Sequence, residues 1–345
     1  MKSDFNNVCI VYTPYSLYLY LLYSTEEEIN NTFYFLGEGI DKRIRDKFEN
    51  KHYFSDALYG NKKPLGRLIY HIRLRYQARK KWPFLADAQL FVQDSFFFSA
   101  ALIAKRNYTL IEDAPNIFHR WREVLNRQRK TFSQVTHTAK RLFRILIENS
   151  FYKEMGDNAQ CTSVLMTKIE SDPILKDKQV IQVNEIDYWN NASESKKNKI
   201  LSIYDVTPED ILELKKRKNI LFTNNLTQLS WMKEQLTEQE LIDIYVERLT
   251  KYDPDTVIIK KHPRDMVDYQ KYFPDIYVFD KHAPMQLLNL IDIRYETAIT
   301  ILSSAVLSFP YPIHIDWIGT EIHPKLLASF GKITLEDYFN NTKPT

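Results

Sequence analysis

The chain has 345 residues, which is enough for two domains of ordinary size that each bury a hydrophobic core. Its 47 basic and 44 acidic residues nearly balance, so the total charge does not indicate a nucleic-acid-binding protein. With only seven glycines, the sequence has neither a GxxxxGK(S/T) nor a GxGxxG phosphate loop, and no CxxC or HExxH spacing indicates a metal site.

The cysteines and the start of the chain bear on the compartment. Cys9 falls within a predicted buried strand, so we expect a reducing compartment rather than a disulfide with Cys161. The apolar run at the start is too short for a signal peptide, and no stretch reaches the roughly 18 apolar residues that span a bilayer. We therefore expect a cytoplasmic protein that is soluble or bound peripherally to a membrane.

The first half of the chain alternates predicted strands and helices. Strands are predicted at 8–12, 32–36, 89–93, 108–111, 164–169 and 179–183, and helices at 15–23, 41–51, 62–82 and 96–105. Thr13 and Pro14 have the pattern of a helix start, with proline in the first position. Strand followed by helix from the first residues onward indicates a parallel α/β sheet.

Two segments of the first half are basic and helical, 62–82 and 118–149. In the first, Leu68, Ile69, Ile72 and Tyr76 recur at helical spacing with arginines between them. A surface helix with a solvated charged face explains this pattern. The alternative is contact with an anionic membrane surface or an anionic acceptor.

A second α/β series follows a domain boundary that we place around Val206-Thr207-Pro208. Strands are predicted at 219–223, 257–262, 276–279 and 297–302, and helices at 237–252, 284–291 and through most of 324–339. Thr237 and Glu240 have the spacing of a capping box. The expected domains are 1–205 and 218–322, joined by a linker at 206–217, with a helical tail at 323–345 that packs back towards the first domain.

The strand at 257–262 ends in a cluster of ionisable side chains. Pro263 cannot donate to a sheet ladder, so the strand should stop at about His262. Open α/β sheets bind ligands at the carboxyl ends of their strands, and a histidine there can exchange a proton near neutral pH. The cations Lys261 and Arg264 indicate an anionic ligand such as phosphate. The alternative is a strand end with solvated charges.

Other predicted strands also end in polar residues. Glu112 and Asp113 follow the strand at 108–111, and their repulsion and partial burial would raise one pKa towards the value of a general base. Ser303 and Ser304 follow the strand at 297–302 and could offer hydroxyl and backbone N–H groups to a phosphate at a helix start. Solvated carboxylates and a plain N-cap explain the same residues.

These groups together describe one reaction. A carboxylate of the first domain would take a proton from an acceptor hydroxyl, while a histidine and two serines of the second would neutralise a departing nucleotide phosphate. That reaction is glycosyl transfer from a nucleotide sugar. Asn224 and Asn225, just after the strand at 219–223, would line the donor site, although turn residues have the same pattern.

The sequence resembles the bacterial sialyltransferases of glycosyltransferase family 52, the lipooligosaccharide and capsule type. Four segments carry the resemblance: 11–17 for the opening strand and Thr-Pro helix start, 111–114 for an acidic motif, 261–265 for a His-Pro motif and 302–305 for a serine motif. Ala114 stands where the family pattern has glycine, and a positive φ there would disfavour alanine. Glu240 or Asp265 are therefore alternatives for the acidic residue.

The resemblance implies a GT-B fold, with two Rossmann-like domains whose parallel sheets face each other across a cleft. It implies an inverting sialyltransferase that needs no metal or cofactor and moves N-acetylneuraminate from the CMP-sugar to a terminal sugar hydroxyl of lipooligosaccharide or capsule. Asp113 would be the base with Glu112 beside it, and His262 would protonate or hydrogen-bond the leaving phosphate. The donor and its phosphate would be bound by Ser303, Ser304, Lys261, Pro263, Arg264, Asn224 and Asn225.

The expected partners are a nucleotide sugar and an oligosaccharide acceptor, without nucleic acid. The basic helices are candidates for contact with the cytoplasmic face of the inner membrane, and a homodimer is a further candidate. Two other functions remain open: the same fold with another nucleotide sugar as donor, and a non-catalytic protein that binds glycans or a membrane surface.

Overall fold

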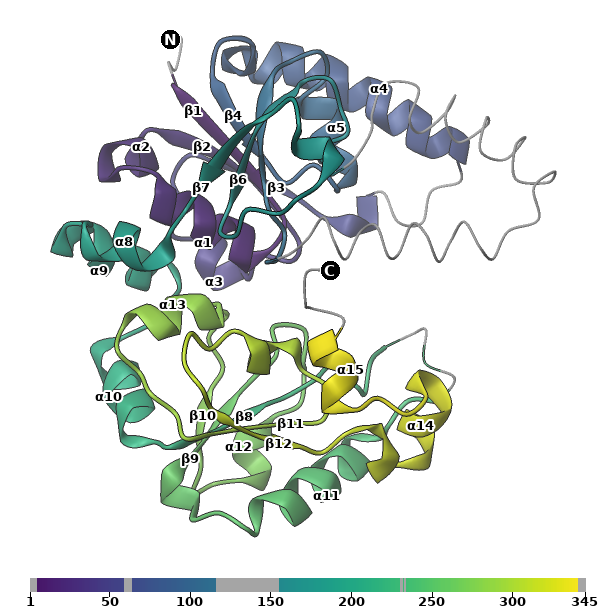
Figure 1. Cartoon of the computed structure of the whole chain (residues 1–345). Coiled ribbons are helices and arrows are strands. Elements are labelled where there is room, and N and C mark those ends of the chain that lie inside the picture. Colours follow the sequence, from purple (N-terminus) through teal and green to yellow (C-terminus); the bar gives the residue numbers. More distant parts are fainter. Residues whose placement is uncertain (1–4, 59–63, 116–154, 230–231, 233, 341–345) are drawn as a thin grey trace. The chain divides into compact units, whose positions relative to one another are not determined.

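The computed structural model describes residues 5–58, 64–115, 155–229, 232 and 234–340 (Figure 1). The basic segment 118–149 lies outside the described residues. The chain divides into two compact units, unit 1 (Met1–Ile200) and unit 2 (Leu201–Thr345). Most of the segment that we expected as a linker forms helix α10 (Pro208–Lys216).

Unit 1 contains a seven-stranded sheet in which every neighbouring pair of strands is parallel. Its strands are β1 (Asn7–Val11), β2 (Thr32–Gly37), β3 (Lys51–Phe54), β4 (Gln89–Val92), β5 (Tyr108–Ile111), β6 (Cys161–Met166) and β7 (Gln179–Gln182). Its helices include α1 (Pro14–Tyr23), α2 (Glu26–Asn30), α3 (Lys42–Arg45), α4 (Pro64–Lys81), α5 (Phe97–Leu102) and α8 (Glu185–Asn190), and α9 (Glu194–Ile203) crosses the division between the units.

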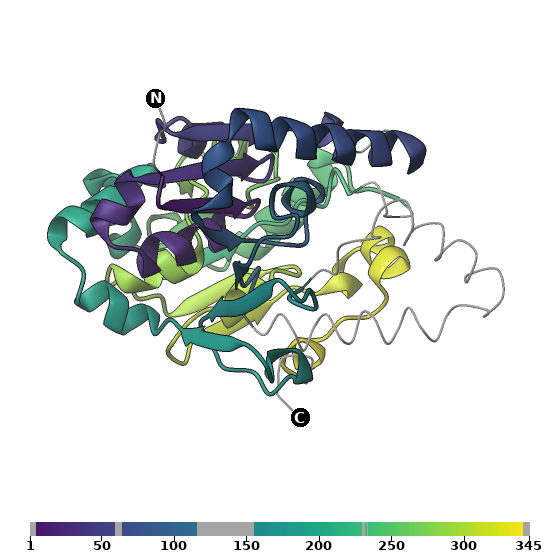
Figure 2. The ribbon, with the colours of Figure 1, turned by 90° about the horizontal axis from the view of Figure 1, so that it is seen from above.

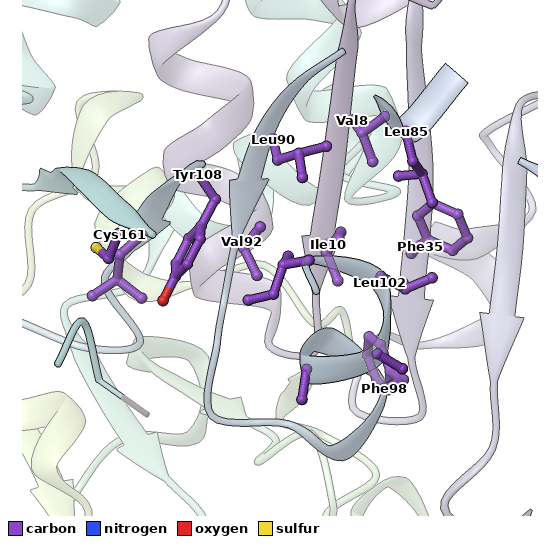
Figure 3. Close-up of a cluster of buried hydrophobic side chains, with 14 of the residues drawn as sticks. Val8, Ile10, Phe35, Leu85, Leu90, Val92, Phe98, Leu102, Tyr108 and Cys161 are labelled. Carbon is purple, nitrogen blue, oxygen red and sulfur yellow. The ribbon is translucent and has the colours of Figure 1, made fainter. Parts of the chain in front are cut away.

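Both faces of this sheet are covered, and the central strand β1 is accordingly buried along its whole length, with apolar side chains from Val8 to Val11. On one face, Val8 and Ile10 of β1 and Val92 of β4 pack in a cluster with α4 and α5 (Figure 3). On the other face, the ring of Phe91 lies 5.0 Å from that of Tyr20 on α1. Helix α1 is buried almost all round, as expected for a helix that packs on a sheet.

Unit 2 contains a five-stranded parallel sheet. Its strands are β8 (Asn219–Phe222), β9 (Val257–Lys260), β10 (Tyr277–Phe279), β11 (Thr297–Thr300) and β12 (His314–Trp317), and its other helices are α11 (Glu238–Leu249), α12 (Tyr269–Tyr272), α13 (Met285–Leu290), α14 (Pro324–Phe330) and α15 (Leu335–Asn340). The capping box of Thr237 and Glu240 is confirmed at the start of α11.

Three expectations about elements are wrong in detail. The charged helix expected at 41–51 ends at Arg45, and Lys51 begins the edge strand β3. The edge strand β12 was not expected, because its residues are exposed or half-buried and form no apolar run. Strand β9 ends at Lys260, although the N–H of Lys261 still donates to the Phe279 carbonyl at 3.0 Å.

The strand orders place the candidate site. The sheet of unit 1 runs β3-β2-β1-β4-β5-β6-β7, and that of unit 2 runs β10-β9-β8-β11-β12. In each sheet the order reverses once, between β1 and β4 and between β8 and β11. Open parallel sheets bind ligands outside the carboxyl ends of the strands at this point. A ligand is therefore expected next to the residues that follow β1, β4, β8 and β11.

Candidate active site

Glu112 and Asp113 follow β5 at the carboxyl edge of unit 1, but their side chains lie in different environments. Glu112 is only 1% exposed. Its Oε1 accepts hydrogen bonds from the Tyr15 hydroxyl at 2.6 Å and from the N–H and hydroxyl of Thr167 at 2.9 and 2.7 Å. Burial raises the pKa of Glu112 to about 7 although these donors lower it. Of the two causes that we expected, repulsion between the carboxylates and burial, burial is the main one.

Asp113 is partly exposed and is held by the ends of two other strands. Its Oδ1 accepts a hydrogen bond from Nε2 of Gln93, which follows β4, and one from the Thr13 hydroxyl at 3.3 Å. Thr13 is also the N-cap of α1, as the sequence predicts. A partly exposed carboxylate fixed at a sheet edge is the geometry that a general base requires.

The alanine in the acidic motif does not strain the backbone. In the described part of the chain, the residues other than glycine that have a positive φ are Lys105, Met155, Asp205 and Asp292, so Ala114 is not among them. The side chain of Ala114 is therefore compatible with this turn.

The alternative acidic residues have local structural roles. Glu240 closes the capping box of α11 and binds the Lys325 ammonium at 2.8 Å, which lowers the pKa of Glu240 to about 2. Asp265 is buried and accepts hydrogen bonds from the Tyr269 hydroxyl at 2.7 Å and from the Val267 N–H at 3.1 Å. Glu112 and Asp113 therefore remain the best candidates for an acidic catalytic site.

In unit 2, His262 lies just beyond β9 and is fixed by two backbone hydrogen bonds. Its N–H donates to the Thr223 hydroxyl at 2.9 Å, and its Nδ1 accepts the N–H of Arg264 at 3.1 Å. Because Nδ1 is the acceptor, the neutral ring carries its proton on Nε2. Burial, followed by the charges of Arg264, Lys260 and His282, lowers the pKa of His262 to about 4. His262 is thus a neutral donor at pH 7, whereas we expected a histidine that can exchange a proton near neutral pH.

Asn224 joins the end of β8 to the end of β11. Its Oδ1 accepts the Leu302 N–H at 3.3 Å and the Thr300 hydroxyl at 3.4 Å. Asn225 differs, because within the described structure its buried Oδ1 has no hydrogen-bond partner. Since Thr223 holds His262 and Asn224 holds Leu302, the His-Pro and serine segments meet at one edge of the sheet of unit 2.

The two serines are less free to bind a phosphate than their sequence suggests. Ser303 is the N-cap and Ser304 the first residue of η5 (Ser304–Leu307), a four-residue 3-10 helix, so the dipole of a long helix is not available. The Ser303 hydroxyl caps this helix by accepting the Ala305 N–H at 3.3 Å, and the Ser303 N–H donates to the Thr300 hydroxyl at 2.9 Å. Ser304 is exposed and follows the cap. Their hydroxyls, rather than their backbone N–H groups, are the better ligands.

Sequence reasoning missed two residues at these edges, Gln93 and Lys260. Lys260 is 7% exposed, and its Nζ lies 5.4 Å from the centre of the Phe279 ring. Burial lowers the pKa of Lys260 to about 8. A lysine that ends a buried strand was a usable signal. A lone Gln93 at the end of β4 was not, because its partners lie far away in the sequence.

Two further observations concern other kinds of site. A cavity of about 210 Å³ lies among β2, α3 and β3, and is lined by Leu36, Lys42, Arg45, Asp46, Lys51, His52 and Tyr53. None of the predicted site residues lines it. Among the described residues no group of three or more His, Cys, Asp or Glu side chains is arranged to hold a metal ion.

Both units have the Rossmann order of parallel strands, with ionisable residues at the carboxyl ends near the reversal of strand order. A chain with two such sheets has the fold of a GT-B glycosyltransferase. The sequence pattern of "Glycosyltransferase family 52" matches residues 77–326, and the chain belongs to this family. The resemblance that the motifs indicated is therefore confirmed, and the protein is a glycosyltransferase.

The chain is also similar to one curated protein and to several solved structures. An uncharacterized protein of Haemophilus influenzae is 28% identical over 330 residues, which cover 95% of this chain and 99% of that protein. The GT-B domain of a Photobacterium damselae sialyltransferase matches with a TM-score of 0.51 and 14% identity over 90% of each chain. A 2,6-sialyltransferase of Photobacterium sp. JT-ISH-224, in complex with CMP and lactose, matches with a TM-score of 0.53 and 13% identity over 90% of this chain and 70% of that one. At these identities the structures confirm the GT-B fold.

Proposed function

We propose that the protein transfers N-acetylneuraminate from its CMP-sugar to a sugar hydroxyl, with inversion and without a metal ion. The observation that carries the proposal is the pair of polar sheet edges, with the Asp113 carboxylate fixed in unit 1 and the neutral His262 donor fixed in unit 2. Membership of family 52 supports it, as does the fold shared with a sialyltransferase in complex with CMP and lactose.

In the proposed reaction Asp113 acts as the base. Its carboxylate accepts the proton of the acceptor hydroxyl while the hydroxyl oxygen bonds to the anomeric carbon of the donor. The bond between that carbon and the phosphate oxygen breaks, and CMP leaves from the opposite face, which inverts the configuration. Glu112 is buried and, with a pKa of about 7, is mostly protonated below that pH, which leaves the partly exposed Asp113 as the proposed base.

His262 stabilises the leaving phosphate in the same proposal. The Nε2–H of the neutral imidazole donates a hydrogen bond to a phosphate oxygen and stabilises the negative charge that develops there as the bond to the anomeric carbon breaks, without giving up its proton. The cations Lys260, Lys261 and Arg264 supply the positive charge that a metal ion supplies in other transferases. The hydroxyls of Ser303 and Ser304 and the amides of Asn224 and Asn225 complete the proposed donor site, together with Pro263, which follows His262 in the chain.

The donor is tested by nucleotide binding to the purified protein. We expect CMP at 100 times its Kd to stabilise the fold by about 2.7 kcal/mol and to raise the melting temperature, because only the folded state binds it. UDP and GDP at the same concentration should have little effect. His262→Ala should weaken the CMP response, whereas His314→Ala, an exposed histidine at the start of β12, should not. A larger response to UDP or GDP would assign another nucleotide sugar as donor.

We also propose that the acceptor is a terminal sugar of a surface glycan such as lipooligosaccharide or capsule, and that α4 brings the enzyme to the cytoplasmic face of the inner membrane. Ile69, Ile72 and Tyr76 on α4 are 42%, 58% and 67% exposed. Arg73 and Lys80 are exposed on the same helix. Both views show α4 extending beyond the sheet of its own unit (Figures 1 and 2). Apolar side chains interleaved with cations favour an anionic membrane surface.

A further inference from the structure

We infer that Gln93 is the positioning residue of Asp113: its side-chain amide ties the proposed base to the start of α1 across the reversal point of the sheet. The inference rests on the proposed function and adds a residue to it. Gln93 directly follows β4 and is 1% exposed. Nothing in its local sequence indicates a role, which only the hydrogen bonds of its amide and backbone reveal.

The amide of Gln93 has one possible orientation. Its Oε1 accepts two backbone N–H groups, from Tyr12 at 2.8 Å and from Thr13 at 3.1 Å. Both donors are fixed because they belong to the turn between β1 and α1. An amide with its oxygen on two N–H groups must direct its NH2 group the other way, and there Nε2 donates to Oδ1 of Asp113. Rotating the amide would leave two N–H groups without acceptors and bring Oε1 against a carboxylate oxygen.

The backbone of Gln93 is fixed as firmly as its side chain. Its N–H donates to the Ile10 carbonyl at 2.8 Å, and its carbonyl accepts the Ser99 hydroxyl at 2.8 Å. The turn on the other side is also packed closely, because the ring of Tyr12 stacks on that of Phe96 with the centroids 4.0 Å apart. A Cβ on Gly37 or Gly39 would collide with Tyr12. Gln93 therefore transmits a rigid position to Asp113.

This arrangement affects the chemistry of Asp113 in two ways. Two donors converge on Oδ1, the Gln93 amide and the Thr13 hydroxyl, and they fix the rotation of the carboxylate. Donors to a carboxylate also stabilise its ionised form, which a base needs before it can accept a proton. The titratable groups around this cluster in the described structure are Glu112, Tyr15 and, through the Tyr12 hydroxyl, Asp56.

The test compares Gln93→Glu and Gln93→Asn with Gln89→Glu, a change at the exposed first residue of the same strand. We expect Gln93→Glu to lower kcat by about 10- to 100-fold. The acidic limb of kcat/KM against pH should move to higher pH by about one unit, because a donor to the carboxylate becomes a second acid. Gln93→Asn keeps an amide but shortens its reach, so it should lower kcat. Because it adds no acid, the acidic limb should move less than in Gln93→Glu. Gln89→Glu should match the wild type, and KM for the donor should change less than about two-fold in all three.

A purely structural role would lower activity equally at every pH and leave the limb in place, and that result would overturn the inference. So would a Gln93→Glu variant with wild-type kinetics. If the wild type transfers no sugar at all, the proposed function fails but the inference is still decided, by the titration of the Asp113 carboxyl followed by 13C NMR. In that case the inference is rejected if the pH midpoint of the Asp113 titration is unchanged in both Gln93→Asn and Gln93→Glu. It is supported if this midpoint is raised in Gln93→Glu. If Gln93→Glu does not fold, Gln93→Leu replaces it, because leucine donates no hydrogen bond to Asp113: a limb or a titration midpoint moved to higher pH supports the inference, and an unmoved one overturns it.

Discussion

Adjacent carboxylates in this chain have different chemistry because the backbone sends them to different places. Glu112 is buried among hydroxyl donors, whereas Asp113 is partly exposed and bound to Gln93 and Thr13. Neighbouring residues at a strand end point to opposite sides, so the separation follows from the pleat. The sequence predicted the pair and its strand. It did not predict which carboxylate is buried, because that depends on Tyr15 and Thr167, which reach Glu112 only in the folded sheet.

The burial of Glu112 makes stability depend on pH. Its pKa rises from about 4.5 in the unfolded chain to about 7 in the folded protein, so the folded state binds the proton more tightly. The contribution is present below pH 4.5 and is lost as the pH rises through 7, and its size over this interval is of the order of 3 kcal/mol. Glu112→Gln cannot lose a proton and should therefore show a smaller fall in unfolding midpoint between pH 5 and pH 8 than the wild type. If denaturant titrations show the same fall in unfolding midpoint between the two pH values for the wild type and for Glu112→Gln, the pKa of Glu112 is not raised by folding.

The elements that the sequence predicted well are those with strong local signals. The turn from β1 to α1 was located by Thr13 and Pro14, and β9 was located by its β-branched run. The edge strands β3 and β12 were missed because half-exposed strands lack such a run. The helix expected after Ser304 is a short 3-10 turn, which the sequence does not distinguish from an α-helix start.

Helix α4 carries the prediction about membrane contact. We expect the protein to sediment with phosphatidylglycerol vesicles and not with phosphatidylcholine vesicles, and to be released as salt rises. Replacing Ile72 and Tyr76 together by aspartate should weaken binding by about ten-fold or more, since each inserted apolar side chain contributes about 1 kcal/mol or more. Leu212→Asp changes an equally exposed side chain on α10 and serves as the control. Binding that survives the double change would remove α4 from the contact.

At the scale of the whole chain, the family was predicted from short motifs that occur in the expected order. The His-Pro and serine motifs indicated family 52, and the family match together with two parallel sheets confirms it. No described helix has both the length and the apolar character to cross a bilayer. The division between the units was the feature that the sequence predicted least well. Helix α10 occupies most of the expected linker at 206–217. The units divide within α9, after Ile200. A boundary inside a continuous helix gives no break in sequence pattern.

The most direct test of the central claim is a transfer assay with CMP-N-acetylneuraminate and lactose, with release of CMP and the sialylated product both measured. We expect the wild type to form one product per CMP released, and Asp113→Asn to lower kcat/KM by about 10²- to 10⁴-fold, the usual contribution of a general base. Asp87→Asn, at an exposed position before β4, should retain full activity. Wild-type turnover by Asp113→Asn, or a folded wild type that neither binds CMP nor forms product on any sugar acceptor, would contradict the account.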